Sequence, residues 1–149
     1  MPEASRRIRP ALLRLLQWWI TLGVASGDSD DLRLKKAVLT LVSSSIAGLA
    51  LFWGVLYTAI GYPLPGAIPL GYSLLSLAST LYFFRTKHFP FFCFSQQLLV
   101  LLLPFLLMWS LGGFANGSVV MIWAIFAPFA ALFFNDLKAA TRWMVAFLA

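Results

Sequence analysis

The sequence has little charge and few chemically reactive side chains. Only 11% of its 149 residues are charged, whereas 61% are hydrophobic. An ordinary soluble domain is about a quarter charged, and a soluble fold of this length cannot bury so much apolar surface in a single core. The composition therefore excludes an ordinary soluble domain and indicates that the lipid bilayer is part of the fold.

Histidine, cysteine and acidic residues are scarce. With one histidine, His88, the chain cannot hold a haem between two of its own histidines or build a multi-histidine metal site. With one cysteine, Cys93, it cannot form an internal disulfide. The five acidic residues lie outside the long apolar runs, which excludes a proton relay through the membrane. We therefore expect no catalytic, cofactor-binding or metal-binding residue in this chain.

Long apolar runs are what the sequence has in abundance. A helix needs roughly 20 apolar residues to cross a bilayer, and four uncharged runs approach or exceed that length. They are residues 37–60, 68–84, 89–111 and 117–134. A fifth run, 139–149, rises only about 16 Å as a helix and contains Arg142, so we expect an incomplete span in a truncated chain. The predicted fold is an all-α integral membrane bundle over residues 27–149, with four complete spans and a truncated fifth.

The basic residues fall on one side of these spans. The 11 Lys and Arg exceed the 5 Asp and Glu, and all 11 lie before the first span, between the second and third, or after the fourth. Basic residues collect on the cytoplasmic side of membrane proteins. The excess is therefore interpreted as topology and not as nucleic-acid binding. It predicts a multi-pass protein of the inner (plasma) membrane with a cytoplasmic N-terminus.

Residues 1–26 are expected to form a separate cytoplasmic segment. From Pro10 onward, polar and apolar side chains occupy opposite faces of a predicted helix, which is typical of a helix lying in the membrane interface. A signal peptide ending near Ala25 is the alternative. The carboxylates of Asp28, Asp30 and Asp31 are expected to start the helix of the first span, because the glycine and glutamate of a calcium-binding EF-hand loop are missing.

A short uncharged segment, "SLGGFANGS" (110–118), separates the third and fourth runs. Gly112, Gly113 and Asn116 tolerate the positive φ angles of a tight reversal, so we expect a turn on the outer side, with a contribution to a ligand pocket as the alternative. Pro104 and Pro128 each remove a helix hydrogen bond and are expected to kink their spans. The kinks either only adjust packing or open a small apolar cavity for a lipid-like or quinone-like ligand. The expected lining residues are Met108, Trp109, Trp123 and Phe126.

Mild polar residues inside the spans are expected to mediate helix packing. Small side chains let membrane helices approach closely, and amides and hydroxyls bond across the contact. The candidates are Ser44, Gly48, Ser76, Gln96 and Gln97. The two glutamines are expected to reach a neighbouring helix.

Several blocks together resemble the N-terminal membrane region of bacterial class III adenylate and guanylate cyclases. The blocks are "GDSDDLRLKKAVLTL" (27–41), "IPLGYSLLSL" (68–77), residues 94–134 and "ATRW" (140–143). The most specific part combines the glycine pair 112–113 with Trp123, Ala127, Pro128, Ala131 and Phe133.

The resemblance implies a membrane anchor or sensor of six spans, working as a homodimer. A cytoplasmic domain would follow it, using two aspartates and a divalent metal (Mg or Mn) to make a cyclic nucleotide from a nucleoside triphosphate. None of those catalytic residues falls within residues 1–149. Two alternatives remain open. One is an input domain of a histidine kinase or diguanylate cyclase, and the other is a small self-contained transporter or lipid-handling protein.

Overall fold

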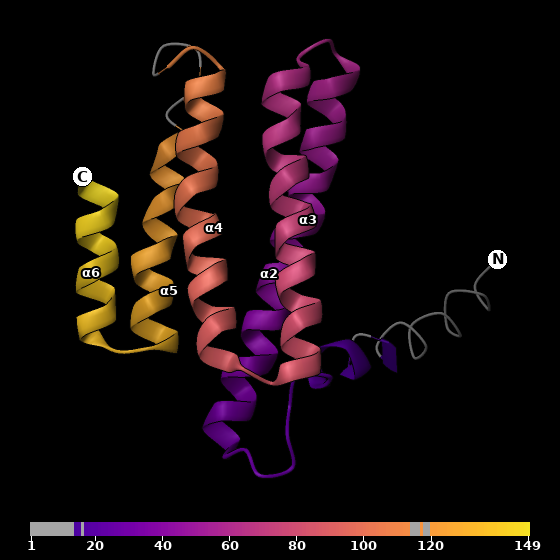
Figure 1. Ribbon diagram of the computed structural model, residues 1–149, viewed down its shortest axis with the longest axis vertical. Coiled ribbons are helices and arrows are strands. Elements are labelled where there is room, and N and C mark those ends of the chain that lie inside the picture. The colour runs from indigo at the N-terminus through magenta and orange to yellow at the C-terminus, as the bar shows by residue number, and fades with distance from the viewer. Residues whose placement is uncertain (1–13, 16, 114–116, 118–119) are drawn as a thin grey trace, which may run out of the picture.

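The computed structural model describes residues 14–15, 17–113, 117 and 120–149, and this part of the chain is helical without strands. Three long helices run alternately up and down, followed by three shorter helical elements (Figure 1). The long helices are α2 (Asp30–Ala59), α3 (Pro63–Thr86) and α4 (Phe89–Ser110). The shorter elements are the 3₁₀ helix η1 (Val120–Ile125), α5 (Phe126–Phe134) and α6 (Leu137–Leu148).

Three of the described helices are long and apolar enough to cross a membrane, namely α2, α3 and α4. Four complete spans are not confirmed. Within the expected fourth span, 117–134, the described helix covers Val120–Phe134, with 6 residues of 3₁₀ helix and 9 of α-helix. At about 2.0 Å and 1.5 Å per residue it rises about 25 Å, short of the roughly 30 Å hydrocarbon core. The 12 residues of α6 rise about 18 Å.

Polar side chains cap the starts of α2 and α6. Ser29 is the N-cap of α2, and its hydroxyl accepts a hydrogen bond from the Leu32 N–H at 3.3 Å. Asp30 and Asp31 lie in the first turn, where carboxylates are favoured. At the start of α6 the Asp136 carboxylate accepts from the Ala139 N–H at 2.7 Å. Asp30 and Asp31 therefore begin a helix, as predicted from the sequence, whereas Asp28 lies before the N-cap and pairs with Lys36 instead.

Two glycines set the close contact between α2 and α3. A Cβ atom on Gly66 would lie 2.3 Å from Thr58 Oγ1 and 2.8 Å from the Gly54 carbonyl oxygen. A Cβ on Gly54 would lie 2.6 Å from Leu70 Cγ. Gly48, the glycine expected to pack helices together, is exposed and has no atom within 4 Å of its Cβ position. Within the described residues Gly48 therefore makes no close helix contact, and the small residues at the α2–α3 contact are Gly54 and Gly66.

Aromatic and small residues join the remaining helices. The Phe83 ring of α3 stacks on the Phe92 ring of α4 with centroids 4.5 Å apart. A second cluster joins Leu101 of α4 to Ala124 and Ala127. Trp143 and Phe147 pack against that cluster from α6. Many large apolar side chains instead point outward, as expected for a lipid-facing surface.

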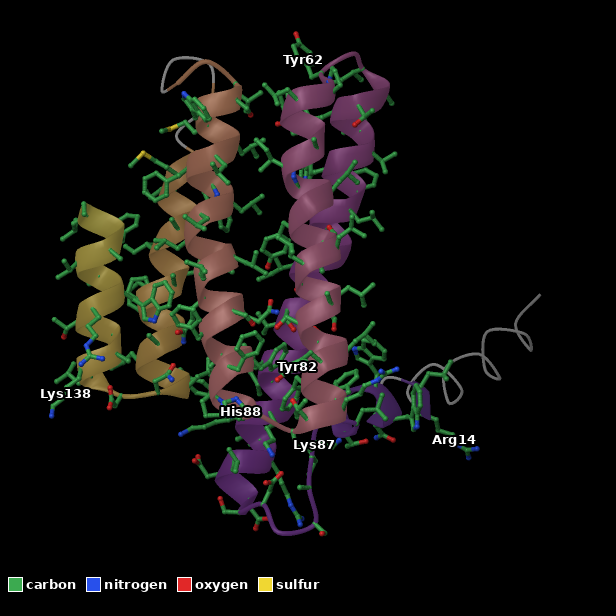
Figure 2. The ribbon with its side chains drawn as sticks, viewed as in Figure 1. Arg14, Tyr62, Tyr82, Lys87, His88 and Lys138 are labelled. Carbon is green, nitrogen blue, oxygen red and sulfur yellow. The ribbon has the colours of Figure 1, made fainter. Side chains whose placement is uncertain are left out.

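Charge is concentrated at one end of the bundle, here called the cationic end. Figure 2 shows Arg14, Lys87, His88 and Lys138 at this end and Tyr62 at the opposite one. The cationic end comprises the start of α2, the α3–α4 turn and the α5–α6 turn. Between the two ends the helices carry apolar and mild polar residues, as a membrane-embedded bundle requires.

Replacing Gly66 with alanine tests the close α2–α3 contact. We expect Gly66→Ala to destabilise the bundle in detergent by about 1–3 kcal/mol, because the added methyl meets backbone as well as the Thr58 hydroxyl. Gly48→Ala is the matched control and should be neutral or slightly stabilising, because alanine favours helix and the space is open. Equal thermal midpoints for the two variants would show that the helices do not meet at Gly66.

Candidate functional site at the cationic end

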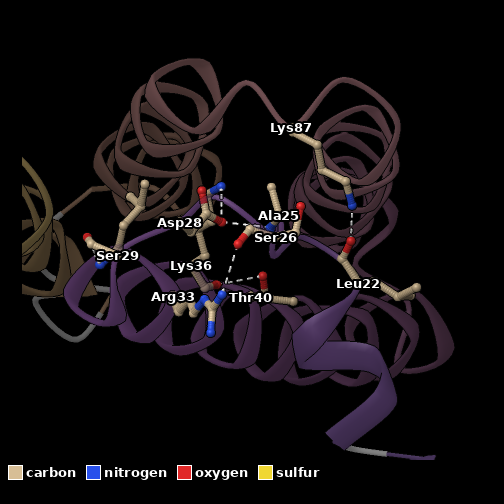
Figure 3. Close-up of polar contacts among 10 residues, drawn as sticks. Leu22, Ala25, Ser26, Asp28, Ser29, Arg33, Lys36, Thr40 and Lys87 are labelled. Carbon is tan, nitrogen blue, oxygen red and sulfur yellow. Dashed lines mark hydrogen bonds and ion pairs between the residues drawn. The ribbon is translucent and has the colours of Figure 1, made fainter.

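Residues 22–29, here called the connecting segment, join the helical residues 17–21 to α2 and cross the base of the bundle (Figure 3). Just before this segment, the Trp19 indole N–H donates to the Ser44 hydroxyl at 2.9 Å. The same indole meets the Phe84 ring edge-on, with centroids 5.0 Å apart. Ser44 therefore holds the N-terminal helical residues against α2, a partner 25 positions away in the sequence.

The connecting segment is also fastened to the end of α3. Gly23 is buried, and a Cβ atom there would lie 2.2 Å from Phe83 Cε1, so a larger residue cannot pass over this ring. The Lys87 ammonium donates to the Leu22 carbonyl oxygen (Figure 3). Lys87 has a left-handed backbone, with φ of 57°, as the residue that ends α3. The turn between α3 and α4 thus also holds the connecting segment, through the hydrogen bond from Lys87.

A shielded ion pair closes the segment onto α2. The Lys36 ammonium lies 2.7 Å from Asp28 Oδ2, and the two side chains are only 4% and 10% exposed. The same oxygen accepts a hydrogen bond from the Ala25 N–H at 2.7 Å. Both interactions lower the pKa of Asp28 below its ordinary value of 3.8, and the hydrogen bond from Lys36 has the larger effect. A carboxylate held in this way is ionised at neutral pH and serves as a structural anchor.

Polar side chains form a second set of contacts between helices. Ser76 of α3 donates to the Gln96 side-chain oxygen of α4 at 2.9 Å, and the Ser79 and Ser95 hydroxyls share a hydrogen bond of 2.5 Å. Gln97 donates from its side-chain nitrogen to Asn135 Oδ1 at 2.7 Å. The buried polar groups of α4 thus face both α3 and the α5–α6 connection.

Two buried polar atoms in the described part of the chain lack a hydrogen-bond partner. They are the Tyr72 hydroxyl of α3 and the Gln96 side-chain nitrogen of α4. Gln96 uses its oxygen to accept from Ser76, which leaves its NH₂ group without an acceptor. An unsatisfied buried donor costs free energy, so this is the least well satisfied polar contact between α3 and α4.

The glycine pair of the predicted turn has the expected backbone. Gly112 and Gly113 have φ angles of 92° and 90°, the left-handed region that favours glycine. Gly117, expected to begin the fourth span, instead belongs to a turn and is buried. Its Cβ position lies 2.9 Å from both the Gly113 carbonyl oxygen and Met108 Cγ. Asn116, the third residue proposed for this turn, falls outside the described residues.

The two tryptophans expected to line an apolar cavity lie on the outside. Trp109 is 79% exposed and Trp123 is 61% exposed. Trp123 stacks on Phe126, another exposed ring, with centroids 5.6 Å apart. Pro104 is buried within the continuous helix α4, and Pro128 is buried in the first turn of α5, where its missing N–H breaks no bond of that helix. In the described part of the chain the prolines are thus packed inside helices, and the tryptophans lie on the surface.

Within the described residues no group of three or more His, Cys, Asp or Glu side chains is placed to hold a metal ion. His88 caps α4, because its Nδ1 accepts from the Phe91 N–H at 3.3 Å. Comparison of the chain with protein-family models, curated proteins and solved structures found no match.

Removing the Asp28 carboxylate should release the connecting segment. We expect Asp28→Ala to speed hydrogen exchange at the Ala25 amide by about tenfold, because a charge-assisted hydrogen bond is lost and Lys36 is left without its partner. Asp30→Ala is the matched control, since the Asp30 side chain is fully exposed. Exchange is followed residue by residue in detergent.

Acid should act on the same contact. The pKa of Asp28 is lower in the folded chain than the ordinary 3.8, so the full contribution of the contact to stability is present above pH 3.8 and is lost as the pH falls through the lowered pKa of the folded chain. Unchanged Ala25 exchange in Asp28→Ala would show that the ion pair does not hold the segment.

Proposed function

We propose that this chain is the membrane anchor and input region of a cytoplasmic signalling enzyme, with its cationic end in the cytoplasm. The observation that carries the proposal is the gathering of charge at one end (Figure 2), where the connecting segment is also fastened. Positive residues collect on the cytoplasmic side of membrane proteins. The N-terminus would then lie in the cytoplasm, and in a bacterium the protein would lie in the inner membrane.

The resemblance of residues 27–41, 68–77, 94–134 and 140–143 to the membrane region of class III cyclases supports the identity of that enzyme. On this proposal, the region positions and dimerises a cytoplasmic domain that makes a cyclic nucleotide from a nucleoside triphosphate. The divalent metal, Mg or Mn, would be bound by that domain and not by residues of this chain. Val120–Phe134 would be the fourth span and α6 the beginning of a fifth.

The topology can be tested with single cysteines at the two ends of α3. In a Cys93→Ala background, we expect Tyr62→Cys to react with a membrane-impermeant maleimide in intact cells and Thr86→Cys to react only after permeabilisation. Both positions are exposed, so accessibility reports the side of the membrane. The opposite labelling pattern would overturn the orientation.

The enzyme assignment can be tested by expressing the complete reading frame that contains these residues. We expect its membranes to convert ATP or GTP to a cyclic nucleotide with Mg²⁺ or Mn²⁺, whereas purified residues 1–149 should convert neither. A reading frame without a catalytic domain, or activity in residues 1–149 alone, would contradict the proposal. A histidine kinase or diguanylate cyclase domain in that frame would retain the anchor and replace the cyclase.

A further inference from the structure

One face of α6 packs against the bundle, and the opposite face is exposed. Ala140 is buried, and Trp143 and Phe147 pack against the cluster of Leu101, Ala124 and Ala127. Trp143 also contacts Phe94 of α4, with ring centroids 5.6 Å apart. The opposite face carries Lys138, Thr141, Arg142 and Val145.

The open face forms a shallow depression at the cationic end. Its four residues are spaced at positions i, i+3, i+4 and i+7, which brings them to one side of a helix. They line a shallow, wide-open surface on the outer side of α6. Lys138 lies at the foot of α6 and points away from the bundle (Figure 2).

The two cations of this face have no acidic partner among the described residues. The three ion pairs within the described part of the chain all join residues of α2 and the connecting segment. The carboxylate nearest in sequence, Asp136, accepts the Ala139 N–H and so caps the helix. The Thr141 hydroxyl donates to the Leu137 carbonyl at 2.9 Å, so positive charge at this face comes from Lys138 and Arg142.

We propose that this face of α6 binds the headgroup of an anionic phospholipid. A guanidinium and an ammonium one turn apart suit a phosphodiester, which accepts charge-assisted hydrogen bonds from both. Val145 is 62% exposed and lies seven residues beyond Lys138, about 10 Å along the helix axis. The face thus changes from cationic to apolar over the distance in which a phospholipid changes from headgroup to acyl chain.

The test uses the full chain in phosphatidylcholine vesicles containing trace spin-labelled phosphatidylglycerol or phosphatidylcholine. The fraction of motionally restricted label gives the relative association of the two lipids with the protein. We expect the unmodified chain to prefer phosphatidylglycerol, and Lys138→Gln/Arg142→Gln to lower that preference by about threefold or more. Inorganic phosphate in the aqueous phase should not displace the lipid.

Two further variants separate this site from general surface charge. Arg14→Gln/Arg85→Gln removes the same charge from exposed positions outside α6 and should keep the preference. Lys138→Arg/Arg142→Lys should keep it as well, and helical content by circular dichroism verifies folding. The proposal is overturned by an equal loss in both glutamine variants, by an unchanged preference in Lys138→Gln/Arg142→Gln, or by displacement with free phosphate.

Discussion

Phe83 is the residue on which the cationic end of the bundle depends. Its ring is completely buried and stacks on Phe92 of α4. Leu39 of α2 belongs to the same cluster, and Gly23 of the connecting segment passes directly over the ring. Four parts of the chain thus meet at one side chain. Because a close-packed contact admits little change of volume, the placement of the N-terminal helical residues is tied to that of α3 and α4.

The helices pack through different interactions at the two ends of the bundle. Near the opposite end, α2 and α3 approach through Gly54 and Gly66, a contact that depends only on the absence of side chains. At the cationic end, contact depends on stacked aromatic rings, the Asp28–Lys36 pair and the Lys87 ammonium on a backbone carbonyl. The division follows from solvation, because charges are expensive in hydrocarbon and are tolerated where water and headgroups begin.

The sequence predicted the long helices well and the local contacts poorly. The third span, expected at 89–111, is α4 at Phe89–Ser110, because a continuous apolar run after a proline leaves few other choices. The second begins five residues earlier than expected, since Pro63 fits the first position of a helix. The fourth, expected at 117–134, is helical over Val120–Phe134, because Gly117 belongs to the turn before it.

The candidate site was harder to predict for a different reason. The polar types at Ser44, Ser76, Gln96 and Gln97 were evident from the sequence, but their partners were not. Ser44 bonds to Trp19, and Gln97 bonds to Asn135, 38 positions along the chain. The Asp28–Lys36 pair joins a loop to a helix, which helical spacing rules do not cover. A single sequence shows which residues need partners, whereas the tertiary fold decides which partners they receive.

On the proposed membrane arrangement, the hydrogen bond between Trp19 and Ser44 marks the level at which the membrane surface meets the bundle. Arg14 is exposed beside the exposed apolar side chains of Leu15 and Trp18, a combination suited to the interface. Ser44 lies 14 residues after the first residue of α2, so about 21 Å of that helix lies between its N-terminal end and this level, on the side of the cationic end. The hydroxyls of the buried residues Thr40 and Ser43 donate to carbonyl oxygens of α2 itself. What remains of the first span, residues 44–60, is about 25 Å long, the same length as η1 and α5 together.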